Sequence, residues 1–142
     1  MSKKYFIVFA ILMFAVLLFF LGNTIIKSRF YLPDLPVEGL TKKEAYEKIS
    51  NRHNDIRYLT NNDNFNWYIY QGSQETFGNE LIKQFNTLGG FTFLEQIGSG
   101  YVFESKGTGD KLIIESQMWT ANYIIFKLPV ELRLEHGSSK MT

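Results

Sequence analysis

The sequence contains no cysteine, only three prolines and only two histidines among its 142 residues. Without cysteine the chain has no disulfide framework, no lipid-modified cysteine and no thiolate ligand for zinc. It also lacks the Gly-x-x-x-x-Gly-Lys-Ser/Thr loop of nucleotide-binding proteins and the Gly-x-Ser-x-Gly elbow of serine hydrolases. These absences leave no motif that identifies an enzyme class.

Charge is missing from one long stretch, because residues 5–26 include no Asp, Glu, Lys or Arg. At a rise of about 1.5 Å per residue, the apolar part of this run spans roughly 26 to 33 Å, which matches the ~30 Å hydrocarbon layer of a bilayer. A helix that is apolar on every side cannot be surrounded by the core of so short a chain. We therefore expect residues 5–26 to form a transmembrane signal anchor in the lipid bilayer, preceded by a short basic segment at residues 1–4.

A cleaved export signal is the alternative interpretation of this run. Cleavage needs two small residues separated by one residue, and the only such pair near its end is Gly22 and Thr24, which follows bulky Leu21. The run is also longer than the roughly 7 to 15 apolar residues of an export signal. An uncleaved anchor is the favoured interpretation.

The distribution of charge gives a weak orientation signal. Lys3 and Lys4 precede the apolar run, Lys27 and Arg29 follow it, and all 14 acidic residues come later. The positive-inside rule slightly favours a cytoplasmic N-terminus, and a mildly acidic domain suits export and disfavours nucleic acid as a partner. We expect a single-pass protein of the cell membrane with its C-terminal domain outside. The lack of any Asn-x-Ser/Thr acceptor favours a bacterial envelope.

After the anchor, residues 27–37 contain two of the three prolines and show no period, which predicts a stiff, extended spacer. An α+β domain is expected over residues 38–136, followed by a flexible polar tail at residues 137–142. Thr41 and Glu44 have the spacing of a capping box and predict a first helix to about Arg52. Strand patterns follow at residues 56–60 and 65–71.

A second helix is predicted from a Ser73 cap to the Gly89-Gly90 pair, with its apolar residues at helical spacing. From Phe91 onward the apolar period changes to two, which predicts strands at residues 91–97, 101–104, 112–119, 122–128 and 130–134. The expected fold is thus one mainly antiparallel sheet with two helices packed on one face.

The sequence gives little support for a catalytic or metal-binding group of residues. His53 and His136 lie far apart without metal-ligand spacing, and the glycine pairs at 98–100 and 107–109 lie between strands, where they predict hairpin turns. Three glutamates on neighbouring predicted strands, Glu95, Glu104 and Glu115, leave one enzyme hypothesis open. Two of them would face each other as an acid and base pair of a small envelope hydrolase or lyase. No metal or other cofactor is expected.

The favoured hypothesis is a non-catalytic binding or accessory module for an envelope protein or peptide. Aromatic side chains on polar-patterned strand positions are its candidate contacts, because Tyr and Trp supply large contact areas at low entropic cost. Packing under the helices is an equally weighted alternative for these residues. Trp119, at the least regular junction of the sheet, is predicted to point outward. The candidate partner-binding residues are Trp119, Tyr123, Tyr68 and Tyr70.

Overall fold

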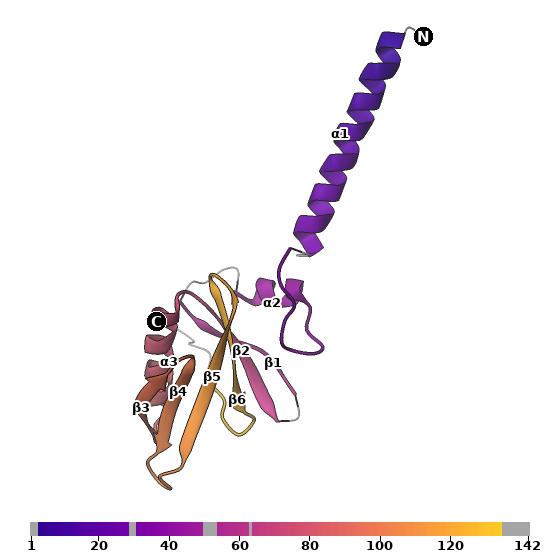
Figure 1. Ribbon diagram of the computed structural model, residues 1–142. Coiled ribbons are helices and arrows are strands. Elements are labelled where there is room, and N and C mark those ends of the chain that lie inside the picture. The colour runs from indigo at the N-terminus through magenta and orange to yellow at the C-terminus, as the bar shows by residue number, and fades with distance from the viewer. Residues whose placement is uncertain (1–2, 29–30, 50–53, 63, 135–142) are drawn as a thin grey trace, which may run out of the picture.

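The computed structural model describes residues 3–28, 31–49, 54–62 and 64–134. Three helices and one six-stranded antiparallel sheet form an α+β protein, in which α1 projects away from the rest (Figure 1). The elements in chain order are α1 (Lys3–Ser28), α2 (Lys42–Ile49), β1 (Ile56–Asn61), β2 (Phe65–Gln71), α3 (Gln74–Leu88), β3 (Phe91–Ile97), β4 (Gly100–Ser105), β5 (Lys111–Thr120) and β6 (Tyr123–Pro129).

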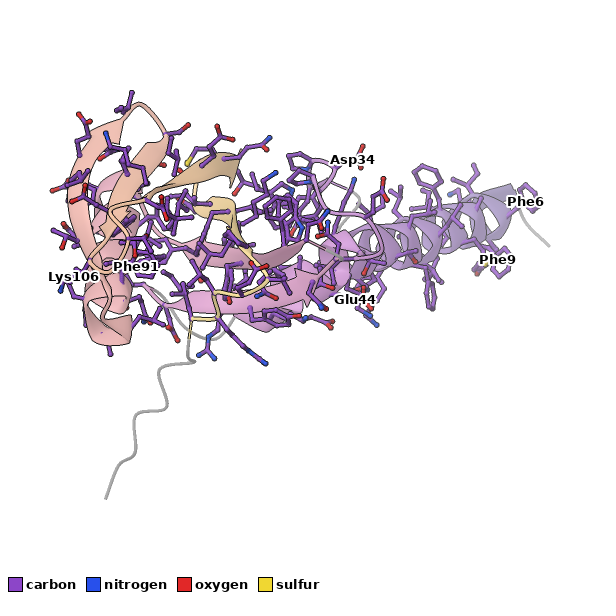
Figure 2. All side chains as sticks on the ribbon, turned by 90° about the horizontal axis from the view of Figure 1, so that it is seen from below. Phe6, Phe9, Asp34, Glu44, Phe91 and Lys106 are labelled. Carbon is purple, nitrogen blue, oxygen red and sulfur yellow. The ribbon has the colours of Figure 1, made fainter. Side chains whose placement is uncertain are left out.

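Helix α1 contains the uncharged run and is long and apolar enough to cross a membrane between Lys4 and Lys27. Its large apolar side chains are exposed all around the helix, as the outward-pointing Phe6 and Phe9 illustrate (Figure 2). The domain therefore contributes almost nothing to covering this helix, and its apolar surface needs another environment.

The strands are arranged in the order β1-β2-β6-β5-β4-β3, with every neighbouring pair antiparallel. Helix α3 joins the inner strand β2 to the edge strand β3, and the chain then returns strand by strand until β6 pairs with β2. The second and last strands of the domain, β2 and β6, thus pair in the middle of the sheet. The two edges are β1 and β3.

One face of the sheet is covered by α3 and is called the α3 face. Phe77, Leu81 and Phe85 are fully buried there against aromatic side chains of the inner strands. The α3 backbone comes so close to β4 that a Cβ on Gly78 would lie 2.9 Å from the Tyr101 ring, so only glycine fits. Gly89, at φ 69°, ends the helix by donating its N–H to the Phe85 carbonyl.

The opposite face is partly covered by α2 and by residues 31–40, which we call the strap, and it is called the strap face. Ala45 and Ile49 of α2 and Leu32 and Val37 of the strap are all buried in a second core cluster. The predicted capping box begins α2, since Thr41 N–H donates to Glu44 and Glu44 N–H donates to the Thr41 hydroxyl. The Thr41 N–H and hydroxyl, which both donate to the Glu44 carboxylate, hold the pKa of Glu44 below its usual value.

The two helices lie on opposite faces, so the prediction that they share one face is wrong. Strand β2 shows this directly, because Tyr68 and Tyr70 join the α3 cluster whereas Ile69 joins the strap cluster. Successive side chains of a strand point to opposite faces. The segment predicted as a stiff, extended spacer, residues 27–37, includes Leu32 and Val37, which are buried against the domain.

Most predicted elements occur, with one difference. Helix α2 is described as far as Ile49, and its predicted continuation to Arg52 lies outside the described residues. The difference is that the predicted strand at residues 130–134 is absent. In that segment Asn66 Nδ2 donates to the carbonyls of Val130 and Leu132, and the Leu134 N–H donates to the Tyr68 hydroxyl. Side chains take up these backbone groups, so the segment crosses the α3 face as an irregular loop.

Candidate functional site

The four predicted partner-binding residues fall into two groups on opposite faces. Tyr68 and Tyr70 are each 1% exposed on the α3 face. The Tyr68 ring stacks on Phe126 with centroids 5.3 Å apart, and Tyr70 packs 5.6 Å from Phe77. Both tyrosines therefore belong to the core under α3, as the alternative interpretation has it.

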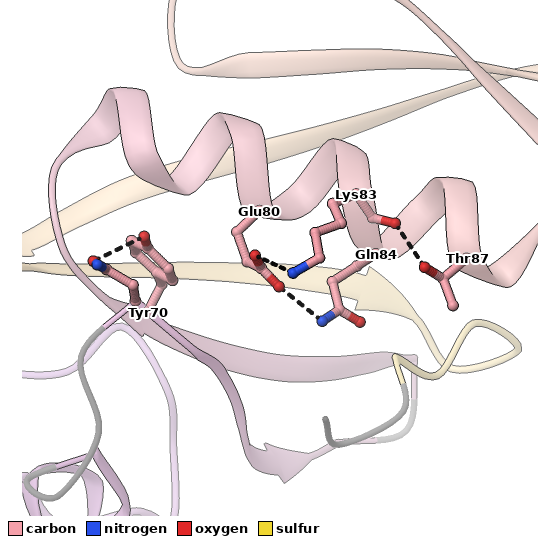
Figure 3. A network of polar contacts seen from close by, with 6 residues as sticks. Tyr70, Glu80, Lys83, Gln84 and Thr87 are labelled. Carbon is pink, nitrogen blue, oxygen red and sulfur yellow. Dashed lines mark hydrogen bonds and ion pairs between the residues drawn. The ribbon is translucent and has the colours of Figure 1, made fainter. Parts of the chain in front are cut away.

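Hydrogen bonds fix these buried tyrosines. The Tyr70 hydroxyl donates to Asn54 Oδ1 at 3.3 Å, beside the network in which Glu80 accepts from Lys83 and Gln84 (Figure 3). Burial raises the pKa of the Tyr68 and Tyr70 hydroxyls above the usual value for tyrosine. Neither hydroxyl is presented to a partner on the surface.

Trp119 lies on the strap face and is 6% exposed, so the prediction that it points outward is wrong. Its Nε1 donates to the Pro33 carbonyl of the strap at 3.0 Å. Tyr123 is half-buried between two rings, 5.9 Å from Trp119 and 5.9 Å from Tyr46 of α2. These two residues join the strap and α2 to the sheet and do not form a free aromatic surface.

The three candidate glutamates share the strap face but do not converge. Glu95 pairs with Val102, and Glu115 pairs with Gly100, so β4 separates these two carboxylates. Glu104 lies near the far end of β4, opposite Lys111. Glu115 lines a pocket together with Gln117 and Lys127. These three glutamates do not form an acid and base pair.

No group of three or more His, Cys, Asp or Glu side chains could hold a metal among the described residues. His53 and His136 lie outside those residues. The described side chains therefore offer no metal centre.

Strand β5 changes partner halfway along its length, and the sheet divides there. Lys111–Glu115 pair with β4, whereas Ser116–Thr120 pair with β6. Continuing the β5–β6 register would set Ile113 opposite Pro129, which has no N–H to donate. We call the opening between the first half of β5 and the end of β6 the fork. Pro129 therefore cannot complete a hydrogen-bonded pair with Ile113.

A pocket of about 390 Å³ lies at the fork, within the size range of ligand sites. Glu115 and Gln117 of β5 contribute a carboxylate and an amide, and Trp67 and Lys127 form the opposite wall. The Lys127 ammonium lies 5.7 Å from the centroid of the Trp67 ring. The Trp67 Nε1 is buried without a hydrogen-bond partner. One carboxylate, one ammonium and an indole suit polar recognition better than proton transfer between two acids.

A second, smaller pocket of about 110 Å³ lies between the strap and the sheet, where Pro33, Pro36 and Trp119 line it. It belongs to the interface that holds the strap in place.

Sequence reasoning missed Trp67, Gln117 and Lys127 as site residues. Trp67 alternates with polar residues in the predicted strand at residues 65–71, a pattern that predicts a core position, and Gln117 and Lys127 are ordinary polar residues of predicted strands. Pro129 was the available signal, since a proline at the end of a central strand marks the place where pairing on one side must stop. Its meaning depends on the register, which the sequence alone does not specify.

The fold and the fork define an α+β domain behind an apolar helix, with a pocket at the fork lined by polar and aromatic side chains. Comparison with protein-family models, with curated proteins and with solved structures finds no match for this chain. The functional argument therefore rests on the residues and their geometry.

Proposed function

We propose that this chain is a single-pass membrane protein whose α+β domain lies outside the cytoplasm and serves as a binding or accessory module for an envelope partner. The observation that carries the proposal is the contrast between α1 and the domain. Helix α1 exposes apolar side chains on all sides, whereas the domain buries two cores of its own. A bilayer is the environment that would cover such a helix.

The strap supports a role close to the membrane. Leu32, four residues beyond the end of α1, is already buried in the domain. Asp34 forms an ion pair with Lys42 at 2.8 Å, which lowers the pKa of Asp34. The domain is held beside the helix end by buried contacts and does not hang on a loose tether.

The uncovered part of the strap face supports binding. This region, called the bare half, comprises the strap-face side chains of β3, β4 and Lys111–Glu115. Ile97 and Ile113 are 63% and 60% exposed there, although Val102 between their strands is buried. Exposed apolar residues grouped on one sheet face are typical of interaction surfaces. The hydrolase or lyase alternative gains no such support, because its glutamates do not converge on a pocket.

Topology is tested with C-terminal fusions of the full chain in bacteria. We expect an alkaline phosphatase fusion to be active and a cytoplasmic-type fluorescent fusion to stay dark. The reverse pattern would place the domain in the cytoplasm and overturn the proposed location.

Binding is tested by photo-crosslinking in cells with a benzoylphenylalanine at position 97, on the bare half. A matched probe at position 43 lies on the solvated side of α2, where Lys43 pairs only with Glu47. We expect a discrete adduct from position 97 and none from position 43. Equal labelling at both positions, or none at either, would argue against a partner on the bare half.

A further inference from the structure

The fork presents unpaired backbone in the middle of the sheet. Ser116 N–H donates to the Ser99 carbonyl, so Ser116, Ile114 and Leu112 direct their backbone groups toward β4. The alternate residues, including Ile113 and Glu115, direct theirs toward β6. Since the β5–β6 register ends at Ser116 and Phe126, no described strand pairs with the edge at Ile113. The first half of β5 is therefore a third strand edge.

Apolar and charged side chains alternate beside this edge. Natural edges are blunted by lysine, proline or inward-pointing charges, and Lys111 is such a residue at the start of β5. In the middle of the edge, Ile113 is 60% exposed on the strap face, two residues from Glu115. Glu95 and Glu104 lie on the same face, so three carboxylates outnumber the ammonium groups of Lys111 and Lys127. An exposed Ile113 beside Glu115 is complementary to a segment that alternates apolar and basic residues.

We propose that the fork binds an extended peptide segment of a partner protein, which adds as a strand to the β5 edge at Ile113. The proposal rests on the proposed function and names the kind of partner. Backbone hydrogen bonds to Ile113 supply the pairing, as in other cases of strand addition. An apolar side chain of the peptide packs on Ile113, and a basic side chain two positions away meets Glu115. The wall of Trp67 and Lys127 closes the far side of the fork.

Amide hydrogen exchange of the full chain in detergent micelles tests the free edge first. The amide of Ile113 should exchange at least about 10-fold faster than that of Ile114, which faces β4. An Ile113 amide as protected as Ile114 would mean that the edge is already paired, and it would overturn the proposal.

Binding is then measured by NMR titration with the probe peptide acetyl-Thr-Lys-Thr-Val-Thr-Lys-Thr-amide. We expect shifts confined to Ile113, Glu115 and the residues across the fork, and at least about 10-fold slower exchange of the Ile113 amide. The control peptide has the same side chains but is N-methylated at alternate residues, so that it cannot pair along the edge. Equal binding of the two peptides, or shifts elsewhere on the domain, would refute strand addition.

Two glutamate variants test the charge argument. Glu115→Lys should reverse the preference between the probe and a version with glutamate in place of lysine, whereas Glu104→Lys, away from the fork, should leave it unchanged. Equal effects of both variants would point to general electrostatic attraction and overturn the site. A cell-wall disaccharide that shifts the same residues while the peptide does not would also overturn it, in favour of a glycan site.

The outcomes separate the two proposals. Correct topology and crosslinking at position 97, without peptide binding at the fork, would refute the fork alone. Peptide binding with a cytoplasmic fusion pattern would refute only the proposed location.

Discussion

The two halves of the sheet differ in whether one or both of their faces are covered by other segments of the chain. Strands β1, β2 and β6 and the end of β5 carry α3 on one face and the strap with α2 on the other, so Ile69 and Ile125 are nearly inaccessible. On β3, β4 and the start of β5, the strap face keeps Ile97 and Ile113 exposed. The difference shows that segments outside the sheet decide which strand residues become core. On the strap face, isoleucine is therefore a core residue in one half and a surface residue in the other.

The largest expected effect compares two residues of β5 on the same face. Trp119→Ala should lower the free energy of unfolding by about 3 to 5 kcal/mol, because it empties the contact under the strap. Ile113→Ala, on the bare half, should change it by less than about 0.5 kcal/mol. Urea unfolding of the full chain in micelles, followed by circular dichroism, measures both. Similar losses for the two variants would remove the distinction between the halves.

The second prediction tests how closely α3 packs against β4 on the α3 face. Gly78→Ala would place a Cβ 2.9 Å from the Tyr101 ring and should cost about 1 to 3 kcal/mol of stability. Gly107→Ala is the control, since nothing lies within 4 Å of its new Cβ. The same unfolding experiment compares them. An unchanged midpoint for the Gly78 variant would show that α3 sits farther from β4.

A smaller effect is expected at the start of α3. Ser73 caps this helix by accepting the Thr76 N–H at 3.2 Å. Ser73→Ala should cost about 1 kcal/mol, whereas Ser73→Asn retains a capping oxygen and should remain close to the original protein. Melting temperatures of the two variants decide the point, and equal values would mean that the cap contributes nothing.

Alkaline pH should gradually lower the stability of the domain through the buried tyrosines of the α3 face. Burial raises the pKa of Tyr68, Tyr70 and Tyr101, so the folded state holds these protons more tightly than the unfolded state. Their contribution to the free energy of unfolding is fully present below the pKa of tyrosine in the unfolded chain, about 10. It is lost as the pH rises through the higher pKa values of the folded state. Urea midpoints between pH 8 and 11 should fall at the alkaline end. The fall should be shallower for Tyr101→Phe, and an identical profile would contradict this origin.

Local signals predicted much of the fold. The capping box at Thr41 and Glu44, the Ser73 cap and the Gly89 terminus are all present in the structure, because each depends on residues within one helical turn. The change of apolar period near Phe91 likewise marks the start of the strand series. Elements set by neighbouring residues could thus be derived from the sequence.

The arrangement of the layers could not be derived in the same way. Strand β2 is apolar or aromatic on both faces at Tyr68, Ile69 and Tyr70, so its pattern does not tell which helix covers which side. Trp119 is covered by Pro33, 86 residues away in the chain. No local pattern reports so distant a contact. The candidate site shares this limit, because the fork depends on the register of Pro129 against β5.

The buried position of Leu32 limits how far the sheet can move from the end of α1. Four peptide steps separate Ser28 from Leu32, and an extended chain covers at most about 14 Å over that distance. With α1 in a bilayer, Leu32 and the strap-face residues around it are confined to within about 14 Å of the end of α1. A partner of the proposed binding module would meet this side of the domain close to the lipid headgroups.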